Sequence, residues 1–260
     1  MNDFKKMAVL IDADNTQLSK LEEMLNEVST YGRIVVKKAY GNWRKTALGK
    51  WEDEIKRLAI KAEQQFDYVA GKNTTDIAMV IDAMDMLHTG MYDAVVLVSS
   101  DSDFTPLAVR LRESGMYIIG VGEKKTPVAF CNACDNFIYL EYLASAKQQK
   151  KAKAKKKEEA KDNDIDIASD ETHANDNDID EIHSLLHIAY EKYQDDDDDY
   201  VNVAAAGDYI KRVKPDFNTY AYGFTKLSTL IKSFPKKYEL KKLNENGKPP
   251  VLAYRCIDKA

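Results

Sequence analysis

Long apolar runs and cysteines are both scarce in this chain of 260 residues. No stretch approaches the roughly 20 uncharged apolar residues that a membrane-spanning helix needs. The first residues, MNDFKKMAVLID, lack an apolar signal segment with a small-residue cleavage site. The three cysteines are too few for a disulfide framework and are odd in number, which indicates a reducing compartment. We therefore expect a cytoplasmic protein with no membrane partner.

Charge is distributed unevenly along the chain, although the net charge is only −5. Residues 1–161 hold 25 basic and 23 acidic residues, a net charge of +2. Residues 162–199 hold 1 basic and 15 acidic residues, whereas residues 200–260 hold 12 basic and 5 acidic residues. The C-terminal part, with a net charge of +7, is therefore the part whose charge suits a polyanion.

Residues 1–143 alternate short apolar runs with segments of helical periodicity, which is typical of βαβ units around a mostly parallel sheet. The runs MAVLI and AVVLV are apolar without alternation, as strands buried on both faces are, and we expect them at the centre of the sheet. The pattern predicts strands at 7–11, 33–40, 66–70, 93–99, 116–122 and 137–143, and helices around 18–30, 47–62, 75–88, 104–114 and 127–134.

The composition changes sharply after residue 144, where the predicted first domain (1–144) ends. Residues 145–177 are a lysine run and an acidic stretch with few apolar residues, which cannot bury enough surface to offset the ordering entropy. We expect a charged flexible linker there. Residues 178–260 contain three segments of helical periodicity and two strands around Asn246-Gly247, a hairpin turn signal. Three helices followed by a hairpin predict a small winged-helix domain.

Aspartates follow the predicted strands of the first domain. Asp12 ends the first strand, Asp101 and Asp103 follow the AVVLV strand, and Asp76 opens a helix. Because the carboxyl ends of parallel strands share one edge, where ligands bind, we expect these four side chains to converge. Their mutual repulsion would be relieved by a hard divalent cation, Mg²⁺ or Mn²⁺. The lack of cysteine and histidine in this group disfavours zinc.

Structural roles are open for some of these residues. Asp12 and Asp76 could instead cap the helices that follow them, and Asn15 could stabilise a tight turn. Asp82 is predicted on the same helix as Asp76, and we expect it on a solvated face.

Three motifs resemble those of a known family: Asp12-x-x-Asn15, Lys72-x-x-x-Asp76 and Ser99-Ser100-Asp101-Ser102-Asp103-Phe104. They are similar to the NYN domain of PIN-like ribonucleases, in its LabA-like (DUF88) branch, over about residues 5–143. The resemblance implies a PIN-like three-layer α/β fold and cleavage of RNA that depends on Mg²⁺ or Mn²⁺. It also implies the metal ligands Asp12, Asp76, Asp101 and Asp103, with Asn15 in support.

A second resemblance lies in the basic C-terminal part, around residues 217–227. This segment is similar to the OST-HTH/LOTUS domain, a small winged helix associated with RNA binding. The predicted RNA contacts of the whole chain are Lys72, Trp43 and Arg44 in the first domain and Lys226, Lys232, Lys236 and Lys237 in the second. Trp43 could equally pack under a loop.

The combined prediction is a metal-dependent ribonuclease whose C-terminal winged helix binds the RNA; the sequence leaves open whether it forms a homodimer. One alternative is a HAD-like phosphatase, because residues 12–16 fit its DxDxT pattern, although a helix is predicted where that family has a flap. Another alternative is a catalytically inactive nucleic-acid-binding adaptor. The pair Cys131 and Cys134 ends a predicted helix, and we expect it to pack in the core.

Overall fold

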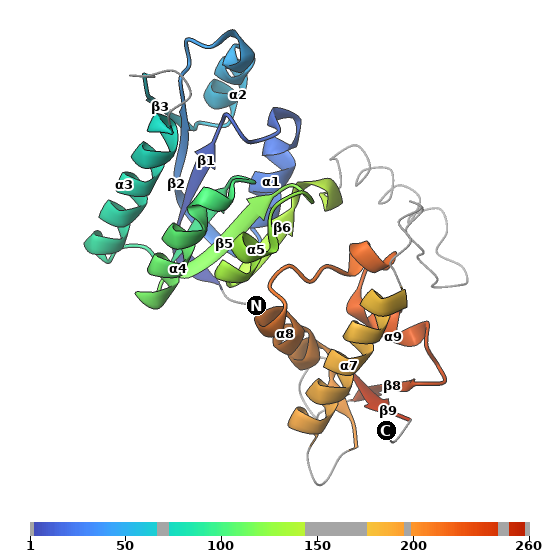
Figure 1. Ribbon diagram of the computed structural model, residues 1–260. Coiled ribbons are helices and arrows are strands. Elements are labelled where there is room, and N and C mark those ends of the chain that lie inside the picture. Colours follow the sequence, from blue (N-terminus) through green and yellow to red (C-terminus); the bar gives the residue numbers. More distant parts are fainter. Residues whose placement is uncertain (1–2, 67–72, 144–175, 195–198, 244–249, 258–260) are drawn as a thin grey trace. The chain divides into compact units, whose positions relative to one another are not determined.

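The computed structural model of the protein describes residues 3–66, 73–143, 176–194, 199–243 and 250–257 (Figure 1). The chain forms two compact units, residues 1–158 and 159–260. The predicted linker, residues 145–177, lies almost wholly outside the described residues, so its bounds stay a prediction. No helix in the described part of the chain is long and apolar enough to cross a membrane.

A parallel sheet of six strands forms the centre of the first unit, in the order β3-β2-β1-β4-β5-β6. The two apolar runs form the adjacent central strands β1 and β4, and every residue of β4 is buried, which confirms their predicted position. The strands are β1 (Phe4–Asp12), β2 (Gly32–Gly41), β3 (Lys61–Gln64), β4 (Ala94–Val98), β5 (Tyr117–Gly122) and β6 (Asn136–Tyr139).

Helices cover both faces of this sheet, which makes three layers (Figure 1). Side chains of β1 alternate between two cores, with Val9 and Ile11 facing one layer and Ala8 and Leu10 facing the other. The first helical layer contains η1 (Leu18–Lys20), α1 (Leu21–Val28), η2 (Thr46–Leu48) and α2 (Trp51–Arg57). The second contains α3 (Thr74–Thr89), η3 (Ser102–Phe104), α4 (Thr105–Glu113) and α5 (Val128–Ala133).

The edge strand β3 is an element that the sequence pattern does not predict. It spans Lys61–Gln64 and overlaps the end of the predicted helix 47–62, where α2 ends at Arg57. The strand predicted at 66–70 lies, apart from Phe66, outside the described residues. An edge strand pairs on one side only and is exposed, so the polar sequence KAEQ carries no apolar signal. The last strand is also shorter than predicted, because η4 (Leu140–Tyr142) follows Tyr139.

The second unit has the predicted order of three helices and a hairpin, with one short strand added. Its antiparallel sheet has the order β7-β9-β8. The predicted turn at Asn246-Gly247 lies outside the described residues. Gly223, at a φ of 78°, ends the short helix η5 before α9 begins. The elements are α7 (Asp176–Tyr193), β7 (Val201–Asn202), α8 (Val203–Val213), η5 (Thr219–Tyr222), α9 (Leu227–Lys232), β8 (Tyr238–Leu243) and β9 (Val251–Cys256).

A buried histidine lies in the core of the second unit. His183 Nδ1 is 2.8 Å from Tyr238 Oη, and its ring packs edge-on against Phe234. Burial, with a contribution from Lys237, lowers the pKa of His183 below its ordinary value of 6.5. The folded unit therefore keeps this histidine neutral at pH 7.

We expect the second unit to lose stability as the pH falls from 7 to 5. A histidine whose pKa is lowered by folding contributes stability that is fully present above pH 6.5 and is lost as the pH falls towards its folded pKa. Calorimetry of the full chain should show a smaller pH dependence of this transition in His183→Gln. Replacing the half-exposed His187 in the same way should leave the dependence unchanged. Equal slopes in both variants would exclude His183 as the cause.

Candidate active site

Asp12 is the last residue of β1, and its carboxylate is buried at the carboxyl edge of the sheet. It accepts hydrogen bonds from Ser99 Oγ at 2.8 Å, from Asn15 Nδ2 at 2.8 Å and from Asn15 N at 3.3 Å. Burial raises the pKa of Asp12 above its ordinary value, although these hydrogen bonds oppose the rise. The helix-cap alternative does not apply, because the cap residue of η1 is Gln17.

Ser99 links Asp12 to the aspartates that follow β4. Its Oγ accepts a hydrogen bond from Asp101 N at 3.1 Å while it donates to Asp12. Asp101 Oδ1 in turn accepts from Asp103 N at 2.9 Å and caps η3. Asp103 Oδ2 accepts from Asn73 Nδ2 at 3.2 Å, which joins this loop to the start of α3. Ser99 belongs to the motif that contains Asp101 and Asp103 but is not a predicted site residue, and Asn73 is indicated only by its position next to Lys72.

Asp76 lies in the first turn of α3 and faces the other aspartates. Burial, and after it the neighbouring negative charges, together raise the pKa of Asp76 to about 6. The charges that act on it belong to Asp12, Asp101, Asp14 and Asp103, in decreasing order. Asn73, not Asp76, occupies the cap position of α3. The structure therefore brings the four predicted carboxylates, and Asp14 with them, to one place.

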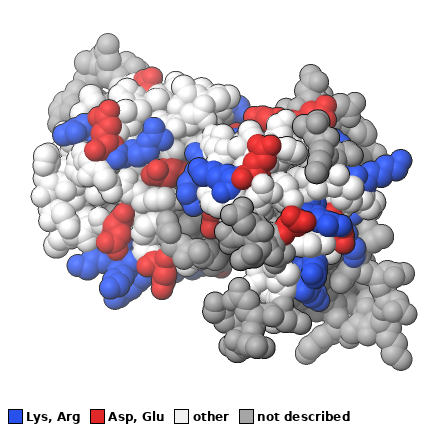
Figure 2. Space-filling model, turned by 90° about the horizontal axis from the view of Figure 1, so that it is seen from below, with Lys and Arg blue, Asp and Glu red and all other residues white. Residues whose placement is uncertain are grey.

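These residues suit a hard divalent cation in their chemistry, because every side chain in the cluster offers carboxylate oxygens. Among the described residues, no three aspartate, glutamate, histidine or cysteine side chains form a ready-made metal-binding group. The fit therefore rests on the donor set and on the neighbouring carboxylate charges, which add to burial in raising the pKa of Asp76. On the face that Figure 2 shows, basic and acidic side chains are interspersed in small groups.

The position of Asp82 in the helix predicts a solvated face, but the structure shows its side chain partly buried and bonded to β2. It accepts from Lys38 Nζ and from Tyr40 Oη, each at 2.6 Å, and Lys38 also contacts Glu63 at 3.2 Å. Although burial raises the pKa of Asp82, the hydrogen bonds from Lys38 and Tyr40 lower it overall. Asp82 therefore fixes α3 against β2.

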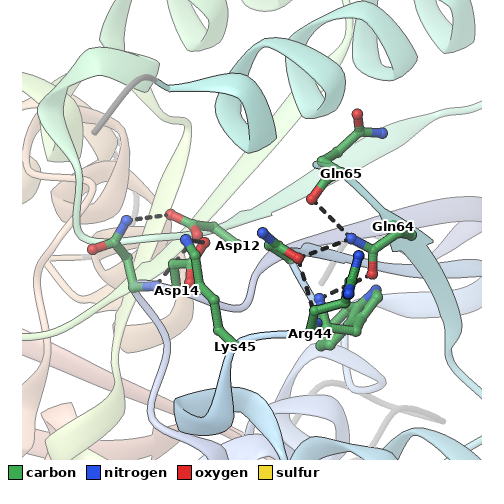
Figure 3. A network of polar contacts seen from close by, with 9 residues as sticks. Asp12, Asp14, Arg44, Lys45, Gln64 and Gln65 are labelled. Atoms are coloured by element: carbon green, nitrogen blue, oxygen red, sulfur yellow. Dashed lines mark hydrogen bonds and ion pairs between the residues drawn. The ribbon is translucent and has the colours of Figure 1, made fainter. Parts of the chain in front are cut away.

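The residues after β2 lie beside the aspartates. Figure 3 shows Lys45 directed towards Asp14 next to Asp12, with Arg44 towards the β3 side. Lys45 Nζ is 3.6 Å from Asp14 Oδ2, and Arg44 is exposed. The ring of Trp43 is half-buried and packs 6.1 Å from Trp51, as the packing alternative predicts.

The remaining predicted RNA contacts divide by what the structure describes. Lys72 lies outside the described residues. Lys226, Lys232 and Lys236 are exposed in the second unit, and Lys237 is half-exposed. The structure therefore leaves the side chains of Lys226, Lys232 and Lys236 accessible to a polyanion.

The cysteine pair packs in the core, as its position in the sequence predicts. Cys131 and Cys134 are both fully buried in the layer of α4 and α5. Burial raises the pKa of the Cys134 thiol, which makes it unreactive. These residues therefore contribute packing and no chemistry.

Comparison with known families gives the same division of the chain. The family model of the NYN domain matches residues 6–141, which is more than half of the chain. The chain belongs to the NYN domain family. The NYN domain is a member of the PIN-like nuclease superfamily, whose enzymes generally use divalent metals. The model of the OST-HTH/LOTUS domain, a domain that suggests RNA binding, matches residues 178–249. Membership of the NYN family favours a nuclease over the phosphatase alternative.

Individual relatives add little to this. An uncharacterized protein of Methanocaldococcus jannaschii, MJ0482, is 26% identical over 124 residues, which cover 45% of this chain and 47% of the relative. The chain thus spans about half the length of that relative. A crystal structure of a Vibrio parahaemolyticus protein of unknown function, VPA0982, has a TM-score of 0.44 at 19% identity and covers 54% of this chain and 94% of its own. An uncharacterized protein of Nitrosomonas europaea has a TM-score of 0.30 at 22% identity, over 39% and 92% of the two chains.

Proposed function

We propose that the protein is a ribonuclease that depends on Mg²⁺ or Mn²⁺ and whose OST-HTH domain binds the RNA substrate. The observation that carries the proposal is the convergence of Asp12, Asp76, Asp101 and Asp103. Hydrogen bonds through Ser99 link the loop of Asp101 and Asp103 to Asp12, and repulsion from these charges adds to burial in raising the pKa of Asp76. A fold gains nothing in stability from such repulsion, so its presence points to a cation or to chemistry.

The aspartates have different tasks in this mechanism. Asp12 and Asp101 would hold the principal cation, with Asp76 and Asp103 completing the pocket or holding a second one. A bound Mg²⁺ or Mn²⁺ supplies a Lewis acid for the phosphodiester oxygens and lowers the pKa of water. Asn15 and Ser99 hold the Asp12 carboxylate in one orientation through their hydrogen bonds.

The OST-HTH domain would capture the substrate. Its side chains Lys226, Lys232, Lys236 and Lys237 suit the phosphates of RNA, and the net charge of residues 200–260 is +7. Tethering to the NYN domain raises the effective concentration of RNA at the aspartates. Affinity should fall as the salt concentration rises, because each phosphate contact releases counterions. The low cysteine content supports a cytoplasmic location.

Removal of divalent metal tests this function. We expect the purified full chain to cleave labelled single-stranded RNA with Mn²⁺ or Mg²⁺, to stop in EDTA, and to recover when Mn²⁺ is added in excess. Mn²⁺ should also raise the thermal unfolding temperature, a readout independent of turnover. RNA that is bound but never cut would support the inactive adaptor. Release of phosphate from small phosphoesters, with RNA left intact, would support the phosphatase.

A further inference from the structure

The loop after β5 lies directly against the loop that carries Asp101 and Asp103. A Cβ added to Gly122, the last residue of β5, would lie only 2.8 Å from the Ser99 carbonyl oxygen. Glycine at this position therefore permits a close approach of the two loops. Glu123 N also donates to Ser100 Oγ at 2.8 Å. The loop after β5 thus continues the surface of the candidate active site.

This continuation carries two cations and an aromatic ring, which we name the β5–β6 platform: Lys124, Lys125 and Tyr142. Lys124 Nζ lies 4.5 Å from the centroid of the Tyr142 ring, and Lys124 N donates to Glu141 Oε1 at 2.8 Å. The two lysines follow β5, and Tyr142 follows β6. This hydrogen bond from the Lys124 backbone to the Glu141 side chain holds the two strand ends together at the carboxyl edge.

The two lysines of the platform are balanced in formal charge by Glu123 and the exposed Glu141, but both lysine side chains are exposed to solvent. Lys125 Nζ is 2.8 Å from Glu123 Oε2, so these two charges are paired. The lysine side chain is 72% exposed, however, and the glutamate side chain only 16%. A polyanion approaching from solvent therefore meets the ammonium group first. Lys124 is exposed as well.

The strand order places the aspartates between two flanks that carry exposed basic side chains. Arg44 and Lys45 follow β2, the aspartates follow β1 and β4, and the platform follows β5. Neighbouring strands are about 4.8 Å apart, so the two flanks are separated by about 14 Å, or three such spacings. Clustered carboxylates repel the phosphates of a nucleic acid, and cations on both sides offset that repulsion where the chain enters and leaves.

We propose that the β5–β6 platform is a second nucleic-acid contact of the NYN domain. Its lysines bind phosphates of single-stranded RNA, and the Tyr142 ring stacks on a base, on the side of the aspartates opposite Arg44 and Lys45. This inference rests on the proposed ribonuclease function. The RNA strand then crosses the carboxyl ends of β2, β1, β4 and β5, and the phosphodiester at the aspartates has chain on both sides.

The test compares two charge-matched double variants of the full chain. Lys124→Gln/Lys125→Gln removes the two cations of the platform, and Lys5→Gln/Arg33→Gln removes two cations from exposed residues at the amino ends of β1 and β2. We expect the platform variant to raise KM for single-stranded RNA about tenfold with kcat nearly unchanged. The slope of log KM against log salt should fall in magnitude by about 1.4, which is 0.7 for each lost contact to a single strand. The control variant should behave as wild type.

Tyr142 separates stacking from charge. Tyr142→Leu should raise KM roughly fivefold without changing the salt slope, because a stacked base contributes no counterion release. Tyr142→Phe keeps the ring and should restore the wild-type KM. Equal KM and salt slope in platform and control variants would exclude the platform while RNA cleavage by the wild type stands. If the wild type cleaves no RNA, the ribonuclease proposal fails by itself. Fluorescence anisotropy with labelled single-stranded RNA in EDTA then tests the platform by affinity, and equal affinities of the two double variants would exclude it.

Discussion

Asp101→Asn should lower the rate of RNA cleavage at least about a hundredfold while the protein stays folded. The Oδ1 atom of an asparagine can still accept the hydrogen bond from Asp103 N, now 2.9 Å long, so the cap of η3 is kept. What the substitution removes is one negative charge from the set that would hold the cation. The loss should therefore appear in activity and in Mn²⁺ affinity, measured by single-turnover cleavage and by titration of the unfolding temperature with Mn²⁺.

Asp85→Asn is the matched control for this experiment. Asp85 is exposed in the same α3 helix as Asp76, and its replacement changes the net charge by the same amount. Its cleavage rate should equal that of the wild type. If Asp101→Asn cleaves RNA as fast as the wild type, the nuclease activity does not come from this cluster.

Asp76→Asn should stabilise the metal-free NYN domain at pH 7. Folding raises the pKa of Asp76 from 3.8 to about 6, so the folded state holds this proton more tightly. Its contribution to stability is therefore greatest below pH 4 and is lost as the pH rises from 4 to 6. Two pKa units correspond to at most about 3 kcal/mol. Because Asp76 is partly exposed, we expect solvent screening to reduce this to about 1–2 kcal/mol, or roughly 3–6 °C in unfolding temperature.

Tryptophan fluorescence measures this effect within the full chain. Both tryptophans, Trp43 and Trp51, lie in the NYN domain, so their signal follows the unfolding of that domain alone. Mn²⁺ should reverse the order, because it should stabilise the wild type and act much less on Asp76→Asn. A variant that is less stable than the wild type at pH 7, with Asp85→Asn unchanged, would show that Asp76 is not under repulsion.

The parts of the fold that the sequence predicts well are those buried on both faces. The AVVLV run reads as a central strand because a strand covered on both sides has only apolar neighbours, and β4 is one. The polar strand β3 and the short helices of the second unit carry weaker patterns. Their positions depend on pairing with β2 and on the turn at Gly223, which are contacts between segments rather than properties of one segment.

The aspartates could be predicted to converge, but their surroundings could not. Parallel strands with aspartates at their carboxyl ends imply one shared edge whatever the side chains in between. Which neighbours support each carboxylate is a different matter. The link from Ser99 to Asp12 crosses 87 residues of sequence, and the network of Asp82 with Lys38 and Tyr40 crosses more than 40.

The sequence by itself determined the two domains' families and the parallel α/β core, and it named four aspartates as the candidate site, because motifs and apolar runs are local properties of the chain. Only the tertiary structure decided that Asp76 is repelled by its neighbours, that Asp82 braces α3, and that Lys124, Lys125 and Tyr142 adjoin the site. These outcomes depend on the order β2-β1-β4-β5 across the sheet, which differs from the order along the chain. Distances between strand ends, and hence electrostatic interactions, follow the order in the sheet.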